Sequence, residues 1–282
     1  MRDPTRDDAL KMVQAIRNLH QETARVLNAL GHAIPPGSQA EAELNGFQEP
    51  ERVKDAYIQA NLLFEGAADH LIAFTKTVTE PAATIAPWTC VRALLESCAL
   101  TAWLIDPAIN VTVRVQRSFA FRYEGLDQQV KCLRSFGRTA DADQMINRIA
   151  EVERDALALG YPPIVNDKGK RIGIAQRMPS ITDIINVTLT EESTYRLMSA
   201  MAHGHMWAYR HLGFKLVDDA GELALEKHLK PFLVQYLCVK TANTFAKPVW
   251  LKGRLFGWNM QEIKAVFASV FADLRSRWIE PS

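Results

Sequence analysis

The sequence lacks the paired cysteines that bind zinc or cross-link small secreted domains. Its four cysteines are scattered along 282 residues and form no C-x-x-C pair. Three of them, Cys90, Cys98 and Cys238, lie among apolar residues, where free cysteines are usually buried. Disulfide-stabilised folds belong mainly to oxidising compartments. The pattern therefore predicts free thiols in a reducing cytoplasm.

The chain also has almost no net charge. Its 33 Lys and Arg against 32 Asp and Glu give a formal charge of +1 at pH 7. A strong excess of basic residues is typical of nucleic-acid binders, so the near-neutral charge argues against this class of protein. A local basic patch is still compatible with it. A chain that is 48% hydrophobic and 23% charged has the balance of an ordinary globular protein.

The sequence shows neither a signal peptide nor a convincing membrane span. The first residues, MRDPTRDD, carry charges where a signal peptide has an apolar stretch. The most apolar run, Trp88 to Ile105, contains Arg92 and Glu96. Charges at the centre of a span are costly. We therefore expect a cytoplasmic protein with no membrane partner.

The short motifs of common hydrolases are missing as well. There is no H-E-x-x-H, and no acidic cluster stands beside the histidines, so we expect no metal and no cofactor. There is no G-x-S-x-G turn for a serine nucleophile. Gly169-Lys170 lacks the upstream glycine of a phosphate-binding P-loop.

What the sequence does have is helical periodicity. Residues 50–78 carry apolar side chains close to the 3.6-residue period, and residues 88–106 are apolar nearly all round, as in a helix at the centre of a bundle. The chain predicts one all-α domain over residues 1–282, with seven to nine helices. We expect core helices over about 50–212 and C-terminal helices over 229–280 packed on them. Further helices are expected at about 5–31, from Pro107 onwards, and at 140–159, 180–187, 190–211, 232–245 and 259–278.

Several segments interrupt this pattern. Residues 161–179 contain two short apolar pieces around Gly169 and predict a small hairpin or an ordered loop. Residues 214–225 predict a second β-hairpin that turns near 219–221. Residues 33–50 are expected to form a loop. Pro248 is expected to kink or interrupt its helix.

The stretch from Thr190 to His211 contains three of the seven histidines. Thr190 before two glutamates predicts a helix start, and apolar residues including Trp207 predict a buried face. On such a helix Arg196, Ser199 and His203 share one side, with Tyr195 beside them. His203 and His205 point about 200° apart, unless the helix breaks at Gly204.

Two further sets of residues are ambiguous. Arg92 and Glu96, at i and i+4, form either a buried ion pair that fixes helix register or part of a site made with the 190–211 helix. Arg114 and Arg117 are read as a solvated face, with a phosphate-facing row as the alternative. His70 is expected to be packed or surface-exposed.

Metal-free RNA cleavage needs a group with a pKa near neutrality and a fixed cation, which histidine and arginine supply. Arg196 and His203 form an R-x6-H pattern, which resembles the R-x4-6-H motif of the HEPN superfamily of all-α proteins. The Tyr-x3-Ser-x3-His face and the Arg92-x3-Glu96 helix also look like uncharacterised bacterial helical proteins near that superfamily. The resemblance covers about residues 50–212.

The resemblance implies a metal-independent ribonuclease of defence or toxin type that acts on RNA as a homodimer and has a cognate antitoxin as a partner. Arg196 would hold phosphate and His203 would act as acid or base. Supporting residues would be Tyr195, Ser199, Arg92, Glu96, His70 and His205. One alternative is a non-catalytic helical protein whose Arg92, Arg196 and His203 face binds a nucleotide, a small ligand or a partner. Another is a purely structural polar network.

Overall fold

The computed structural model describes residues 4–31, 34–79, 81–219, 222–227 and 229–278. These contain eleven α-helices, one short π-helical turn and two β-hairpins. The predicted all-α bundle with small β excursions is confirmed. There are more helices than the seven to nine expected, because a helix forms in the predicted 33–50 loop and the predicted 190–211 helix is divided.

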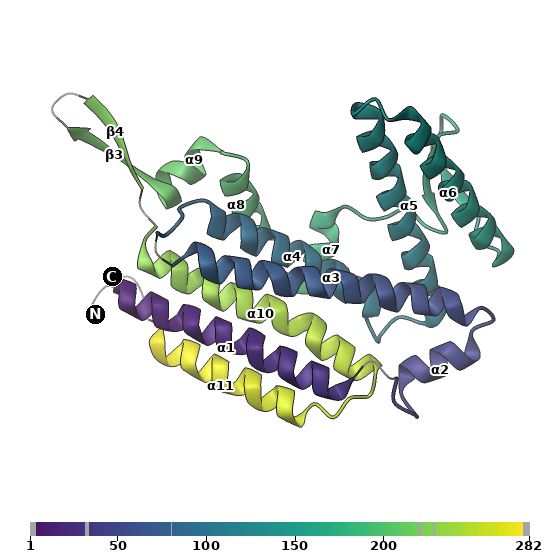
Figure 1. The fold of residues 1–282 in the computed structure, drawn as a ribbon, viewed down its shortest axis with the longest axis horizontal. Helices are drawn as coiled ribbons and strands as arrows, with labels where there is room; N and C mark the ends of the chain where they lie inside the picture. Colours follow the sequence, from purple (N-terminus) through teal and green to yellow (C-terminus); the bar gives the residue numbers. More distant parts are fainter. Residues whose placement is uncertain (1–3, 32–33, 80, 220–221, 228, 279–282) are drawn as a thin grey trace.

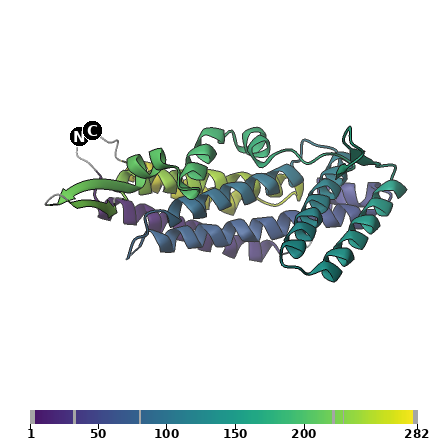
Figure 2. The same cartoon turned by 90° about the horizontal axis from the view of Figure 1, so that it is seen from above.

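Five long helices lie side by side as the body of the molecule (Figures 1 and 2). They are α1 (Arg6–Leu30), α3 (Pro50–Thr77), α4 (Ala86–Ile105), α10 (Pro231–Leu255) and α11 (Gln261–Arg277). Helix α4 packs against α3 and α10, and α1 packs against α10 and α11. The predicted central place of the residue 88–106 segment is therefore confirmed.

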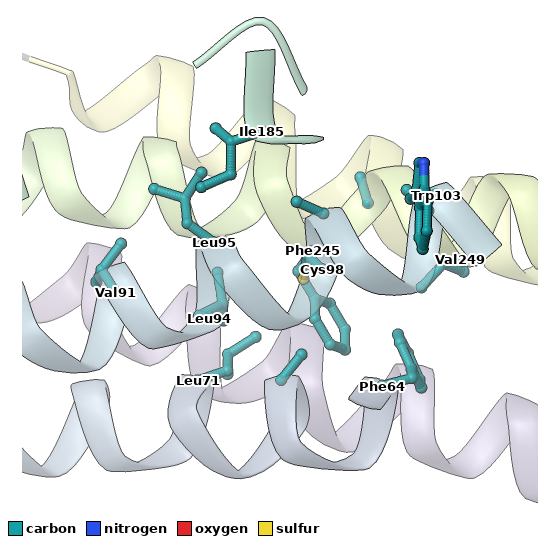
Figure 3. Close-up of a cluster of buried hydrophobic side chains, with 14 of the residues drawn as sticks. Phe64, Leu71, Val91, Leu94, Leu95, Cys98, Trp103, Ile185, Phe245 and Val249 are labelled. Atoms are coloured by element: carbon teal, nitrogen blue, oxygen red, sulfur yellow. The ribbon is translucent and has the colours of Figure 1, made fainter. Parts of the chain in front are cut away.

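The core between α3, α4 and α10 is apolar and closely packed (Figure 3). Phe64 of α3 stacks on Phe245 of α10 with ring centroids 5.2 Å apart. Leu94 and Cys98 of α4 are fully buried beside them. Burial of this kind favours folding because apolar surface leaves water.

A second pair of helices projects from the bundle (Figure 1). Helix α5 (Val111–Ser135) packs against α6 (Thr139–Ala158), and the hairpin of β1 (Pro163–Val165) and β2 (Arg171–Ile174) follows. The strands are antiparallel, with Ile164 opposite Gly173. The Tyr123 hydroxyl donates to the Arg171 carbonyl at 3.0 Å, which ties this hairpin to α5.

The remaining elements lie along α4 and at one end of the bundle. Helices α7 (Ile181–Leu189) and α8 (Glu192–Ala202) pack on α4. After α9 (Met206–Ala208) and the turn η1 (Tyr209–Gly213), strands β3 (Phe214–Asp219) and β4 (Glu222–Lys227) form an antiparallel hairpin that extends away from the body (Figure 1). The predicted second hairpin is confirmed, although residues 220–221 of its turn lie outside the described residues.

Three sequence-based boundaries differ from the structure. Helix α2 (Gln39–Gly46) forms within the expected loop because the Ser38 side chain accepts from Glu41 N. Helix α5 begins at Val111 rather than at Pro107, since Asn110 caps it through a 2.9 Å bond from Val113 N. Helix α10 continues through Pro248, which is buried among other core residues of that helix. Packing along the rest of α10 offsets the backbone hydrogen bond that proline cannot donate.

The arginine row of α5 is neither solvated nor open to phosphate. Arg114 is fully buried, and its Nε and Nη2 donate to the two carboxylate oxygens of Glu43 at 2.7 and 3.0 Å. Its Nη1 donates to the Leu104 carbonyl at 2.6 Å. Arg117 donates to the Trp103 carbonyl at 2.6 Å and lies over the Trp103 ring. Both arginines therefore connect the start of α5 to the body.

Helix α4 alone among the described helices is long and apolar enough to cross a membrane. Most of its apolar stretch, 61%, is buried against other helices, as in the core helix of a soluble protein. The cysteines are free. Cys98 and Cys238 are buried in the core, as the sequence predicted, whereas Cys90 is only partly buried. Burial raises the pKa of the Cys98 and Cys238 thiols, so they remain protonated.

Folding stability should fall as the pH is lowered from 7 to 5, in part through His20 of α1. Burial lowers the pKa of His20, although Glu65 acts in the opposite direction, and the His20 Nδ1 has no hydrogen-bond partner. Unfolded His20 takes up a proton near its ordinary pKa of about 6.5, so protonation favours the unfolded chain. Urea unfolding at several pH values should therefore show a shallower acid decline for His20→Gln. Parallel profiles for the variant and the wild type would contradict this role.

Candidate functional site

The segment predicted as one helix over 190–211 is broken beside its histidines. Helix α8 ends at Ala202, and Gly204 has a φ of +71°. His205 N donates to the Ala200 carbonyl at 2.9 Å, which closes the helix end as in a Schellman motif. His203 therefore occupies the cap position of α8, and its side chain is exposed at the helix terminus.

The structure brings His203 to Arg92 of α4. Arg92 Nη1 lies 3.1 Å from His203 Nε2, although 111 positions separate the two residues. A guanidinium is always protonated and only donates, so Nε2 must accept in this contact. The imidazole in this arrangement is neutral, with its proton on Nδ1.

Glu96 and Tyr195 hold Arg92 in place. Arg92 Nε lies 3.0 Å from Glu96 Oε1 as an ion pair, outside hydrogen-bond geometry. The Tyr195 hydroxyl donates to Glu96 Oε1 at 3.0 Å and accepts from Arg92 Nη2 at 3.5 Å. The Arg92 guanidinium also lies over the Tyr195 ring, 5.5 Å from its centroid. We call Arg92, Glu96, Tyr195 and His203 the α4–α8 cluster.

The cluster has a buried base and an exposed end. Tyr195 is buried, the Arg92 and Glu96 side chains are 23% and 31% exposed, and His203 faces solvent. Partial burial acts to lower the pKa of Arg92, but its contacts with Tyr195 and Glu96 raise it above its ordinary value. A fixed, permanently charged guanidinium therefore lies beside a neutral, accessible imidazole.

Arg196 does not join this cluster. Its Nε and Nη2 contact Glu192 Oε1 at 2.8 and 2.7 Å, one turn earlier on α8, and its side chain is 69% exposed. The ion pair directs Arg196 toward the start of α8, whereas His203 lies at the other end. The arginine that contacts His203 is therefore Arg92 and not Arg196. This agrees with the second of the two roles that the sequence left open for Arg92, as part of a site made with the 190–211 segment.

The remaining predicted site residues make fewer contacts. Ser199 of α8 and His70 of α3 are half-buried, and His205 is exposed. Within the part of the chain that the structure describes, none of the three side chains forms a hydrogen bond or an ion pair. No group of three or more His, Cys, Asp or Glu among the described residues is arranged to hold a metal ion.

Sequence reasoning missed an exposed apolar pair next to the cluster. Met206 and Trp207, on α9, are 69% and 52% exposed. The periodicity predicted a buried Trp207, but the break at Gly204 changes the direction of the chain before this residue. Gly204 was the one available signal, because glycine readily adopts positive φ.

Comparisons with protein-family models, curated proteins and solved structures found no significant match to this chain.

Proposed function

We propose that the protein is a metal-independent, RNA-cleaving protein whose reactive groups are Arg92 and His203. The single observation that carries this proposal is the 3.1 Å contact between Arg92 Nη1 and His203 Nε2 at an exposed surface. A neutral imidazole beside a fixed cation is the pair that cleavage at a 2′-hydroxyl needs. The R-x6-H pattern that resembles the HEPN superfamily shares His203 with this pair but has Arg196 in place of Arg92.

Each side chain in the α4–α8 cluster has a role in this proposal. Arg92 transfers its hydrogen bond from His203 to a phosphate oxygen, and His203 Nε2 then accepts the 2′-hydroxyl proton. The 2′-oxygen attacks phosphorus, the bond to the 5′-oxygen breaks, and the leaving oxygen takes a proton from water. Glu96 and Tyr195 position Arg92, while the exposed Trp207 ring offers a surface on which a base can stack.

The resemblance extends the proposal to a cytoplasmic homodimer that belongs to a defence or toxin–antitoxin system. Free cysteines agree with a reducing compartment. Two copies of the α4–α8 cluster meeting across a dimer would place a second histidine near the leaving oxygen.

A second candidate is a binding protein without catalysis. It is favoured by the completeness of the Arg92 contacts, since His203, Tyr195 and Glu96 all engage its guanidinium. In that case the cluster binds a nucleotide or a partner by exchanging one of these contacts. RNA would then be bound but not cleaved.

Purified protein should cleave single-stranded RNA in EDTA and leave 2′,3′-cyclic phosphate ends. His203→Gln should reduce the rate about 100-fold, because a positioned acid or base contributes at least this much. Arg92→Gln should also lose activity, since an uncharged amide cannot replace the guanidinium at phosphate.

Arg196→Gln serves as the matched control because Arg196 is on α8 but outside the α4–α8 cluster, and it should retain activity. Circular dichroism and the molecular mass in solution should be the same for all variants. Folded wild-type protein that binds RNA without cleaving it would exclude the nuclease proposal and support the binding one. Loss of activity in Arg196→Gln with full activity in Arg92→Gln would assign the phosphate contact to Arg196.

A further inference from the structure

The segment that follows His203 is exposed and contains no acidic residue. From Ser193 to Val217 the sequence has no Asp or Glu, although the chain as a whole has 32 acidic residues among 282, about one in nine. Residues 203–207 are all exposed, and so are Arg210 and His211. A surface that carries cations without acids attracts anions, so this end of the molecule favours a polyanionic partner.

Helix α9 and the turn η1 together form a helical segment with an inner and an outer side. The inner side packs on the body and consists of Ala208, Tyr209, Leu212 and Gly213. The outer side carries Trp207, Arg210 and His211, which follow one another at i, i+3 and i+4 and therefore share one face. The Trp207 side chain is 52% exposed there. We call Trp207, Arg210 and His211 the α9–η1 surface.

The α9–η1 surface has a fixed place beside the α4–α8 cluster (Figure 1). A Cβ built on Gly204 would lie 3.6 Å from the Tyr209 hydroxyl oxygen, so Tyr209 packs on the residue that directly follows His203. At the end of η1, a Cβ on Gly213 would lie 3.4 Å from Met201 Cε of α8. These two contacts hold the turn against the end of α8, where His203 is exposed.

The side chains of the α9–η1 surface are free to bind a ligand. Within the part of the chain that the structure describes, none of the three forms a hydrogen bond or an ion pair. The next cation along the chain, Lys215, lies opposite Glu226 of β4, so its charge is partly balanced. A free guanidinium beside an exposed indole ring is the combination with which proteins bind single strands, because the cation contacts phosphate and the ring stacks on a base.

We propose that the α9–η1 surface binds single-stranded nucleic acid, with one base stacked on Trp207 and a neighbouring phosphate bound by Arg210 and His211. These contacts involve base faces and phosphates and do not read the 2′-hydroxyl, so the surface binds RNA and DNA strands alike. The proposal rests on the proposed function in one respect, namely that a bound RNA strand continues to the α4–α8 cluster for cleavage.

Fluorescence anisotropy with a labelled single-stranded DNA of about 12 nucleotides tests the proposal, since single-strand binders cover about 4–16 nucleotides. The deoxy strand has no 2′-hydroxyl, so its binding is measured without cleavage. The wild-type protein should bind the strand saturably at low ionic strength. Trp207→Ala should weaken binding about tenfold, as the loss of one stacked base does. Arg210→Gln should weaken it as well, through the lost phosphate contact.

The dependence of binding on salt distinguishes the two contacts. Arg210→Gln should lower the slope of log Kd against log salt concentration by about 0.7, the contribution of one phosphate contact to a single strand. Trp207→Ala should leave this slope unchanged, because stacking releases no counterion. Arg254→Gln and Phe136→Ala are the matched controls, since both residues are exposed but lie at the far end of α10 and at the end of α5. Both controls should bind as the wild type does.

Trp207→Ala and Arg210→Gln should keep the circular dichroism of the wild type, because both side chains are exposed. Absence of saturable binding by the folded wild type would overturn the proposal, as would binding that neither variant weakens. Tighter binding of a DNA duplex than of either separate strand would also overturn it, since paired and stacked bases leave no free face for Trp207.

This surface and the ribonuclease function can fail separately. Binding of the deoxy strand by a protein that does not cleave RNA would support the α9–η1 surface and exclude the ribonuclease function. RNA cleavage with an unchanged KM in both Trp207→Ala and Arg210→Gln would support the ribonuclease function and exclude the surface.

Discussion

Replacing Arg114 with alanine should lower the free energy of unfolding by about 3–5 kcal/mol, the usual effect of removing one partner from a buried ion pair. Glu43 would be left buried with its main cation gone, and the carbonyls of Leu104 and Asp106 would lose their donor. Burial together with the bond to Glu43 raises the pKa of Tyr57, so its hydroxyl stays protonated and donates to Glu43 at 2.7 Å. That single neutral donor cannot replace a guanidinium.

Urea unfolding followed by circular dichroism measures this effect. Arg138→Ala is the matched control, because Arg138 forms its ion pair with Asp141 at the surface and such pairs contribute at most about 1 kcal/mol. The double variant Arg114→Met with Glu43→Leu should recover much of the loss, since no unpaired charge remains buried. Equal stability of Arg114→Ala and Arg138→Ala would show that the buried network contributes little.

Phe245→Ala should cost about 3–5 kcal/mol, as large-to-small changes of buried aromatic residues do. The ring is 1% exposed and stacks on Phe64, so its removal leaves a cavity between α3, α4 and α10 (Figure 3). The three helices are held by the rest of their cores and can close that cavity only in part. The lost contacts and the residual cavity both lower stability.

The same urea experiment tests this change, with Phe136→Ala as the control. Phe136 is 75% exposed at the end of α5, and its replacement should change stability by no more than about 0.5 kcal/mol. A loss below about 1 kcal/mol for Phe245→Ala would mean that the core repacks around the missing ring. A smaller slope of the unfolding free energy against urea concentration would instead indicate that the folded state has become less compact.

Helical periodicity was sufficient for the general architecture. The apolar stripe of residues 50–78 and the nearly continuous apolar surface of residues 88–106 identified α3 and the central α4. The first residues of the helices were predicted less well. Asn110 rather than Pro107 caps the start of α5, and Ser38 caps α2, which lies in a segment expected to be a loop. Several residue types can start a helix, so the sequence alone does not choose between neighbouring candidates.

The candidate site likewise combines residues that the sequence identified with a contact that it did not predict. The sequence identified all four members of the α4–α8 cluster and left open whether Arg92 forms an ion pair with Glu96 or meets the segment containing His203. It paired His203 with Arg196 because both lie on one predicted helix. In the structure Arg196 forms an ion pair with Glu192 on the same helix, and His203 is contacted by Arg92 of α4 instead.

The fold class, the central helix, the second hairpin and the residues from which a site can be built were predictable from the sequence, whereas residues 161–179 were left open between a hairpin and a loop. These features follow from local patterns, because periodicity and turn residues act within a few positions of one another. The pairing of Arg114 with Glu43 and the contact between Arg92 and His203 could be seen only in the folded protein. The two residues of each pair are 71 and 111 positions apart in the chain, respectively. Their proximity arises from helix packing, and no local pattern records it.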